Sequence, residues 1–282
     1  MTPQQYCINK TNKSGSSFLP AFYFLGKEKR MALTALYAFC REVDDIVDGC
    51  DDYKEGRKKL NWWSLEVSRL FSETPRHPVT KSLVNYIYKF DLDEKYFNEI
   101  IDGMEMDLNF NRYENFTKLQ LYCYRAASAV GILSAKIFGF SNINTLKYAH
   151  DMGIALQLTN IIRDLGEDAK RGRIYIPLDE LKLFDLTETD ILNCTNHKKI
   201  KKLVIFLSER AQNFFFSAVE HLPAEDKRKQ LPGLMMGNIY FVLLKKIVTS
   251  DPEKILNKRT LLSPYRRVII ALTCFMNYTW IK

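Results

Sequence analysis

The chain divides into helical-length segments separated by short breaks, and this division constrains the fold more than any other feature. Good helix formers fill the segments, and no stretch shows the regular alternation of valine, isoleucine and threonine that favours a strand. Only 12 glycines and nine prolines occur in 282 residues. We therefore expect an all-α fold of about eight or nine helices. The segments are 27–48, 54–72, 79–90, 94–110, 115–139, 143–170, 198–221, 231–249 and 258–279.

These segments follow one another without a low-complexity linker or a strong internal boundary. No repeat with a period of about 20–50 residues is present. Hydrophobic residues make up 46% of the chain, which is enough to bury a sizeable core. We expect residues 1–282 to form a single bundle-like domain.

The cysteines and the chain ends indicate a cytoplasmic location. Six cysteines are scattered, and none forms a CxxC pair, which is typical of reduced thiols. The first residues do not show the charged and then apolar pattern of a signal peptide. The apolar run VIIALTCFMNYTWI spans about 14 residues, whereas a membrane-spanning helix needs about 20. We expect this run to be a packed C-terminal helix.

The formal net charge is +8, which suits nucleic acid, an acidic membrane surface or an anionic small substrate. The dense basic patch HKKIKK (197–202) is most often a solvated helix face, and no nucleic-acid recognition motif accompanies it. We expect no nucleic-acid partner. We expect weak, salt-sensitive association with anionic lipids at the inner face of the membrane.

Two acidic motifs lie in segments that otherwise read as buried helices. Asp44 and Asp48 are four residues apart in REVDDIVDG (41–49), and Asp164 and Asp168 repeat this spacing in NIIRDLGED (160–168). Positions i, i+4, i+7 and i+11 share one helix face. Each pair therefore ends a polar stripe near the C-terminal end of its helix. The first stripe consists of Tyr37, Arg41, Asp44 and Asp48. The second consists of Gln157, Asn160 or Ile161, Asp164 and Asp168.

Carboxylates in such places are costly unless a cation neutralises them. Two carboxylates about 6 Å apart repel by about 3 kcal/mol at an effective dielectric constant of about 20. At a helix C-terminus they also oppose the macrodipole. Oxygen ligands without nearby histidine or cysteine suit Mg²⁺, which in turn binds phosphates. The stripes therefore predict Mg²⁺ and a bound phosphate, for which Arg41 would supply a further cation. A solvated helix end would explain one such motif better than two.

Three motifs resemble those of the squalene/phytoene synthases. YAFCREVDDIVDG (37–49) and QLTNIIRDLGEDAKRGRIYIP (157–177) are similar to the family's two aspartate-rich motifs, and YCYRAASAVG (122–131) is similar to its central helix. The resemblance runs from about Ser14 to Tyr240. Four features look most similar to the presqualene diphosphate synthases of the hopanoid pathway. They are SGSSF (14–18), LNWW (60–63), GMEMDL (103–108) and ASAVG.

The resemblance implies helices around a deep central cavity and a role for each matching residue. The implied Mg²⁺ ligands are Asp44, Asp48, Asp164 and Asp168, with Asn160 lining the second metal site. The implied residues of the reacting centre are Arg41, which would bind diphosphate, Tyr37 packed against it, Gln157 and Tyr240.

Further substrate contacts are implied along the same cavity. Ser17 would touch a phosphate, and Asp107 would face the metal cluster. The remaining implied contacts are Phe18 and Phe22 with the prenyl tail, and Tyr122 and Val130 from the central motif. Phe18 and Phe22 also fit as ordinary core aromatics. The chain has Arg125 where many relatives have tyrosine, so this side chain would either bind diphosphate or point outward.

The implied reaction is the Mg²⁺-dependent head-to-head (1′-1) condensation of two farnesyl diphosphates to presqualene diphosphate. NADPH is not expected, because the reaction would stop at the cyclopropyl product and leave it to downstream isoprenoid enzymes. Released diphosphate or a tyrosine would be the base. The alternatives are a phytoene, dehydrosqualene or squalene synthase, or an inactive scaffold or assembly protein. Chain-elongating synthases and terpene cyclases also carry DDxxD, but NIIRDLGED matches neither of their second motifs.

Overall fold

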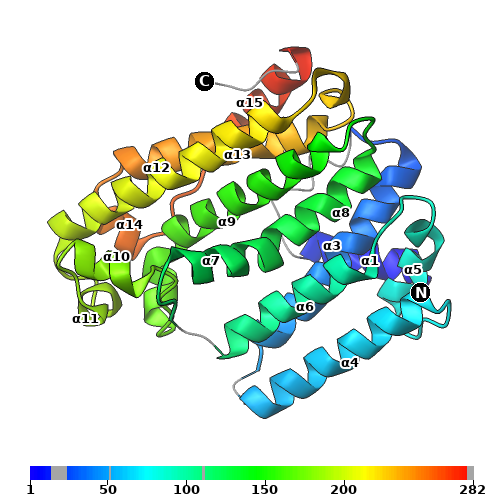
Figure 1. The fold of residues 1–282 in the computed structure, drawn as a ribbon, viewed down its shortest axis with the longest axis horizontal. Coiled ribbons are helices and arrows are strands. Elements are labelled where there is room, and N and C mark those ends of the chain that lie inside the picture. The colour runs from blue at the N-terminus through cyan, green and yellow to red at the C-terminus, as the bar shows by residue number, and fades with distance from the viewer. Residues whose placement is uncertain (14–23, 51, 110–111, 278–282) are drawn as a thin grey trace.

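The structure is a computed structural model that describes residues 1–13, 24–50, 52–109 and 112–277. Every regular element in these ranges is helical and none is a strand, which confirms the predicted all-α class. The long helices lie nearly side by side (Figure 1). They are α1 (Pro3–Lys13), α3 (Lys27–Asp48), α4 (Tyr53–Phe71), α5 (Pro78–Ile87), α6 (Glu94–Asn109), α7 (Phe116–Cys123), α8 (Ala129–Phe138), α9 (Asn144–Lys170), α12 (His197–His221), α13 (Leu231–Thr249) and α15 (Pro264–Asn277).

Shorter elements connect these helices. They are the π-helical turn η1 (Tyr124–Ser128), α10 (Leu178–Leu183), α11 (Glu188–Leu192), the 3₁₀ turn η2 (Ala224–Asp226) and α14 (Pro252–Asn257). The sequence pattern misses α10, α11 and α14, because an amphipathic period is hard to recognise in so few residues, and it misses α1, whose residues are mostly polar. The predicted start of the last helix at 258 is wrong, because the chain is extended there and α15 begins at Pro264, a residue suited to a first helical position.

The predicted segment 115–139 is one continuous helical run, in which η1 joins α7 to α8. This run lies against α9 at a point of very close approach. A Cβ atom on Gly153 of α9 would lie 2.5 Å from Cα of Ser128, so only glycine fits there. Ser128 is buried and donates a hydrogen bond to the His150 carbonyl at 2.7 Å. The central motif and α9 are thereby held together as two walls of the molecule's interior.

Helix α13 has the length and apolar composition of a membrane-spanning helix, and it alone does so among the described residues. However, 72% of its most apolar window is buried. Packing against α9, α12 and α15 explains this composition, as in the core helix of a folded domain. All six cysteines are free thiols, as the sequence predicts.

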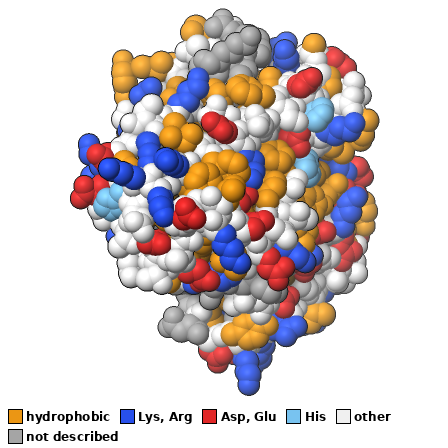
Figure 2. Space-filling model, turned by 60° about the vertical axis from the view of Figure 1, so that its left-hand side comes forward, with side chains coloured by type: hydrophobic (Ala, Val, Ile, Leu, Met, Phe, Trp, Pro, Cys, Tyr) orange, Lys and Arg blue, Asp and Glu red, His pale blue; other side chains and the backbone are white. Residues whose placement is uncertain are grey.

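Basic and acidic side chains are interspersed on the face drawn in Figure 2, rather than gathered into one basic surface. The patch HKKIKK begins α12, where His197, Lys198 and Lys202 are exposed as predicted. Lys201 is half-buried and donates hydrogen bonds to the carbonyls of Val248 and Ser250, at the C-terminal end of α13. A lysine in that position satisfies carbonyls that have no partner within the helix.

A buried carboxylate fastens α4 to α5. Glu66 is fully buried and accepts hydrogen bonds from the amides of Arg76 (2.6 Å) and His77 (2.7 Å) and from the Thr80 hydroxyl (2.6 Å). Arg69 pairs with its other oxygen at 3.1 Å. Burial by itself would raise the pKa of Glu66, but these hydrogen bonds lower it overall. The ionised form is therefore the one that the fold stabilises.

We expect Glu66→Gln to lower the free energy of unfolding at neutral pH by about 1–3 kcal/mol, measured by urea denaturation, because buried donors lose a charged acceptor. The pKa of Glu66 is depressed in the folded state, so its contribution is present above the unfolded pKa of about 4.3 and disappears as the pH falls through the folded value. The difference between parent and variant should shrink below about pH 4.3.

Glu209→Gln on α12 is the control, because Glu209 is exposed and its replacement should change stability by less than about 0.5 kcal/mol. Equal losses in the two variants would contradict the role assigned to Glu66.

Candidate active site

Two cavities meet between α3 and α9, one mainly apolar and one mainly polar. Their volumes are about 300 Å³ and about 650 Å³, respectively. Because five residues line both cavities, the two form a continuous chamber with a polar end and an apolar end. The shared residues are Tyr37, Arg41, Asp44, Gln157 and Asn160. All five belong to the stripes that the sequence singles out.

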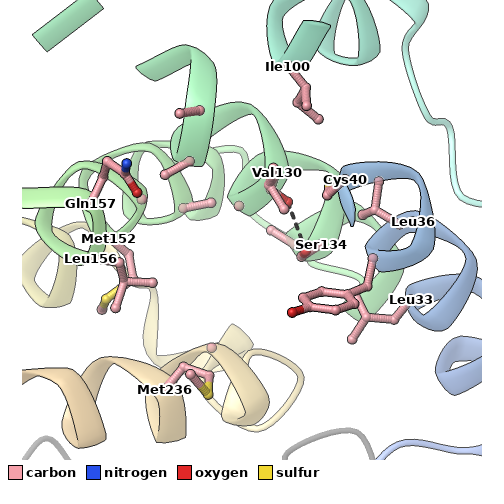
Figure 3. A pocket seen from close by; sticks show the side chains of 18 of the residues that line it. Leu33, Leu36, Cys40, Ile100, Val130, Ser134, Met152, Leu156, Gln157 and Met236 are labelled. Atoms are coloured by element: carbon pink, nitrogen blue, oxygen red, sulfur yellow. Dashed lines mark hydrogen bonds between the residues drawn. The ribbon is translucent and has the colours of Figure 1, made fainter. Parts of the chain in front are cut away.

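The apolar end is enclosed by helices from both halves of the chain (Figure 3). Val130, which the sequence predicts as a substrate contact, is among its lining residues. The Ser134 hydroxyl also borders this space but donates to the Val130 carbonyl at 2.8 Å, so its polarity is satisfied within the helix. Other lining residues are Leu33, Leu36, Ile100, Met152, Leu156 and Met236.

The polar end contains all four aspartates of the two acidic motifs. On α3, Asp44 pairs with Arg41, and Asp48 lies 3.2 Å from Arg171 and 3.9 Å from Arg173. Burial raises the pKa of Asp44, although the Arg41 guanidinium opposes this shift. The C-terminal end of α3 therefore meets the loop that follows α9 through ion pairs.

The aspartates of α9 differ from each other in their partners. Asp164 pairs with Arg163 of the same helix, whose Nε lies 2.7 Å away, and with Arg259 at 2.8 Å. Asp168 sits one turn further on, where burial and the neighbouring Asp164 carboxylate raise its pKa to about 7. A cation bound near Asp168 would relieve the repulsion between the Asp164 and Asp168 carboxylates.

Arginines of the polar end are the functional candidates that the sequence interpretation missed. Arg163, Arg171 and Arg173 lie within the quoted motif NIIRDLGEDAKRGR, so their place beside the aspartates was a usable signal. Arg259 and Arg267 come from the C-terminal region and carry no local signal. Together with Arg41, these side chains make a chamber that is rich in both carboxylates and guanidinium groups.

Asp107 also lines the polar end, as the resemblance implies, and both of its oxygens accept hydrogen bonds from tyrosines. The donors are Tyr122 at 2.9 Å and Tyr175 at 2.8 Å. Burial raises the pKa of Asp107 to about 6, although these hydrogen bonds oppose the shift. Gln157 Nε2 lies 3.4 Å from the Tyr122 hydroxyl, so the central motif and the α9 stripe are in contact.

The remaining predicted residues fall in three places. Tyr240 of α13 lines the polar end beside Arg163, and burial raises its pKa. Arg125 pairs with Glu99 at 3.0 Å and Asp102 at 3.5 Å, and it lines neither cavity, so of the two open roles the structure supports the outward one. The other predicted contacts, Ser17, Phe18 and Phe22, lie outside the described residues.

The residues of the polar end fit a divalent cation by their chemistry. Oδ1 of Asn160 is buried and accepts no hydrogen bond in the described part of the structure, so an acceptor remains available in the chamber. Carboxylate and amide oxygens are the ligands that Mg²⁺ prefers. In the described ranges, no three acidic, histidine or cysteine side chains form a ready metal-binding group. Three of the four aspartates are instead paired with arginines. A metal ion would have to take the place of these arginines as the partner of each carboxylate.

This arrangement suits a ligand with an anionic head and an apolar tail. Guanidinium groups bind phosphate oxygens through paired hydrogen bonds, and the adjoining apolar cavity would bury a hydrocarbon chain. Gln157, one of the residues shared by the two cavities, connects the junction between them to Tyr122 and Asp107 of the polar end.

Comparisons with known proteins agree with this description. The sequence profile of the squalene/phytoene synthases matches residues 11–266. A phytoene synthase from Arthrospira platensis is 33% identical over 278 residues, which cover 94% of this chain and 90% of that protein. A 15-cis-phytoene synthase from Synechocystis sp. is 32% identical over 276 residues, which cover 89% of this chain and 82% of that protein.

Solved structures show the same fold. A dehydrosqualene synthase in complex with a ligand superposes with a TM-score of 0.84 at 26% identity, covering 97% of this chain and 95% of the other. The squalene synthase HpnC from Alicyclobacillus acidocaldarius superposes with a TM-score of 0.77 at 24% identity, covering 87% and 94%. With the family profile matching most of its length, this chain belongs to the squalene/phytoene synthase family.

Proposed function

We propose that this protein condenses two farnesyl diphosphates head-to-head (1′-1) to presqualene diphosphate and releases one diphosphate. The observation that carries the proposal is the continuous chamber, in which Tyr37, Arg41, Asp44, Gln157 and Asn160 line both the polar and the apolar end. The family acts on prenyl diphosphates, and such a substrate needs one site of each kind.

The polar end would bind the diphosphate groups. Asp44, Asp48, Asp164 and Asp168, with Asn160, would hold Mg²⁺, which when bound neutralises diphosphate and makes it a better leaving group. Arg41 would contact the same anion directly, as would the arginines that surround the aspartates. If the arginines bound phosphate oxygens in place of the aspartates, the aspartates would be free to bind the metal.

The apolar end would hold the prenyl tails and keep water away from the reacting carbon atoms. In the proposed reaction, the carbon–oxygen bond of one substrate breaks and diphosphate leaves with the electron pair. The double bond of the second substrate attacks the allylic cation, and loss of one proton closes the cyclopropane ring. The products are presqualene diphosphate, diphosphate and one proton, so atoms and charges balance.

Released diphosphate is the better candidate for the base that takes this proton. Burial raises the pKa of both Tyr240 and Tyr122, so these hydroxyls stay protonated and act as hydrogen-bond donors. Diphosphate would remain beside the arginines of the polar end after it leaves. We therefore assign the tyrosines, including Tyr37, to positioning of substrate and diphosphate.

The product assignment rests on the motifs SGSSF, LNWW, GMEMDL and ASAVG, which look most similar to presqualene diphosphate synthases. A second candidate is the condensation of two geranylgeranyl diphosphates to phytoene. The specific observation in its favour is the identity of 32–33% to the two phytoene synthases described above. Substrate length distinguishes the two reactions, so the purified protein must be offered both substrates.

We further propose that the protein works in the cytoplasm, in weak contact with the inner face of the membrane, and passes its product to downstream isoprenoid enzymes. The amphiphilic substrate and product support this location, as does the net charge of +8. An inactive scaffold would not need four carboxylates in one chamber, and turnover in the assays below would exclude that role.

Replacement of Asp48 or Asp168 by asparagine should abolish turnover, measured as Mg²⁺-dependent release of diphosphate, because each change removes a charge that would hold the metal. Without Mg²⁺ the melting temperature of Asp168→Asn should equal that of the parent or rise slightly, because repulsion from Asp164 is relieved. That of Asp48→Asn should change little, because Asp48 is solvent-exposed and so is Arg171, the nearer of its two arginine partners. Mg²⁺ with pyrophosphate should raise the melting temperature of the parent but not of either variant.

Glu55→Gln on α4 is the control, because Glu55 is exposed and lines neither cavity, whereas Asp45 forms an ion pair with Arg41. It should retain most of the activity. Normal turnover in Asp48→Asn or Asp168→Asn would refute the metal role.

Farnesyl diphosphate with Mg²⁺ should yield presqualene diphosphate, identified by mass spectrometry, and added NADPH should leave the product unchanged. The reaction stops there because no hydride is delivered. Asp168→Asn under the same conditions is the control for enzyme-independent products. Squalene that forms only with NADPH would overturn the one-step reaction. Phytoene from geranylgeranyl diphosphate, with no product from farnesyl diphosphate, would establish the second candidate instead.

A further inference from the structure

Helix α15 packs against the bundle with only one of its faces. Ile270 and Cys274 are buried, and the Cys274 sulfur accepts a hydrogen bond from the Asn238 amide of α13 at 3.3 Å. The helix lies at the edge of the molecule, next to α13, at the top of Figure 1. Its opposite face is exposed, and at one end of that face Phe275 also meets the Phe24 ring, with 5.3 Å between the ring centroids.

That outer face is apolar over its whole length. Its large hydrophobic side chains recur at the helical spacing of three and four residues, so they form one continuous stripe. The exposed fraction of these side chains runs from 41% for Phe275 to 77% for Tyr265. The stripe consists of Tyr265, Val268, Ile269, Leu272, Phe275 and Met276. Isolated exposed apolar residues are ordinary, but a contiguous stripe indicates an interaction surface.

The chain around this stripe carries only positive charge. After Glu253 no acidic residue occurs up to the last residue of the chain. Lys258 and Arg266 flank the start of α15 and are exposed. The six basic residues of this stretch are Lys254, Lys258, Arg259, Arg266, Arg267 and Lys282. Of these, Arg259 pairs with Asp164 and Arg267 lines the chamber, so the exposed positive charge beside the stripe comes from Lys254, Lys258 and Arg266. An apolar stripe flanked by this charge matches a partner that is apolar and anionic.

The stripe also lies beside the polar end of the chamber. Leu261 and Leu262, just before α15, line that end, and so does Arg267 from the first turns of the helix. Leu261 is itself 59% exposed, so the apolar surface continues from the stripe toward the chamber. A partner bound to the stripe would therefore sit close to the place where an amphiphilic substrate enters or leaves.

We propose that α15 docks on an anionic lipid bilayer, lying in the plane of the surface with its apolar stripe among the acyl chains and its basic residues at the headgroups. A helix of 14 residues is about 21 Å long, too short to span a bilayer but well suited to the interface. This inference rests on the surface of α15 and holds for either candidate product.

A second copy of the chain fits the same face less well. In a two-fold symmetric contact the same patch of each copy meets, so two surfaces that both carry positive charge would be brought together. Their repulsion would oppose the apolar contact, whereas anionic headgroups would neutralise the charge. The argument for a membrane thus comes from charge complementarity together with the apolar stripe.

The test is flotation of the purified full chain, without substrate, with vesicles of phosphatidylcholine alone or mixed with phosphatidylglycerol. We expect the parent to bind the anionic vesicles, and Val268→Glu/Leu272→Glu to bind them at least tenfold more weakly, which corresponds to about 1.4 kcal/mol. Val268→Gln/Leu272→Gln, which adds no charge, should also weaken binding. Leu121→Glu/Leu183→Glu, on exposed positions of α7 and α10, is the control and should bind like the parent.

Each variant should keep the parent's melting temperature and its turnover of detergent-dispersed substrate, because neither Val268 nor Leu272 lines a cavity. The proposal is overturned if the parent does not bind anionic vesicles, or if the α15 variants bind as well as the parent. It is equally overturned if the parent is a dimer without lipid that the α15 variants convert to a monomer. Binding is measured without turnover, so failure here is distinct from failure of the proposed reaction.

Discussion

The neutralisation of acidic side chains at the ends of α3 and α9 is the constraint on which the rest of the structure depends. Two helices that each finish in a pair of aspartates would repel each other if they met without cations. The protein supplies Arg41 and Arg163 from the same helices, and Arg171 and Arg173 from the loop that follows α9. A chamber dense in opposite charges results, in which metal and diphosphate can exchange with the protein's own ion pairs.

Close helix packing brings the most distant of these cations into place. Gly166, within the second acidic motif, lies against α14 so tightly that a Cβ atom would be 1.8 Å from the Leu256 carbonyl oxygen. The glycine therefore allows α14 to pack on α9, and the chain that leaves α14 places Arg259 beside Asp164. Gly166 therefore affects the site indirectly, because the close packing that it allows brings Arg259 to Asp164.

The chamber changes from a polar to an apolar environment over the few residues that line both of its ends. Within the polar end, Tyr122 and Tyr175 each donate a hydrogen bond to Asp107, so the polar groups of these buried side chains are satisfied. After Leu262 the chain forms α15 on the surface, and Arg267 in its first turns still lines the chamber. The proposed reaction and the proposed membrane contact therefore use neighbouring parts of one amphiphilic path.

Local pattern was sufficient for the all-α class, for most of the long helices and for the two aspartate stripes, because helical periodicity and four-residue spacing are properties of the chain itself. The family followed from the same motifs. Short helices such as α10 and α11 escaped prediction because their few residues carry too weak a period. The π-helical turn at Tyr124–Ser128 also left no such mark.

Tertiary structure decided what the stripes face. Only packing shows that Asp164 meets Arg259, 95 residues further along the chain, that Asp107 is held by two tyrosines, or that Arg125 turns outward to Glu99. It also decided how far each apolar helix is hidden, since α13 is largely enclosed whereas α15 exposes an apolar stripe. The sequence by itself determined the helical class and the two aspartate stripes from which the proposed metal and diphosphate ligands are drawn. Their neighbours depend on contacts between distant segments, which no local pattern encodes.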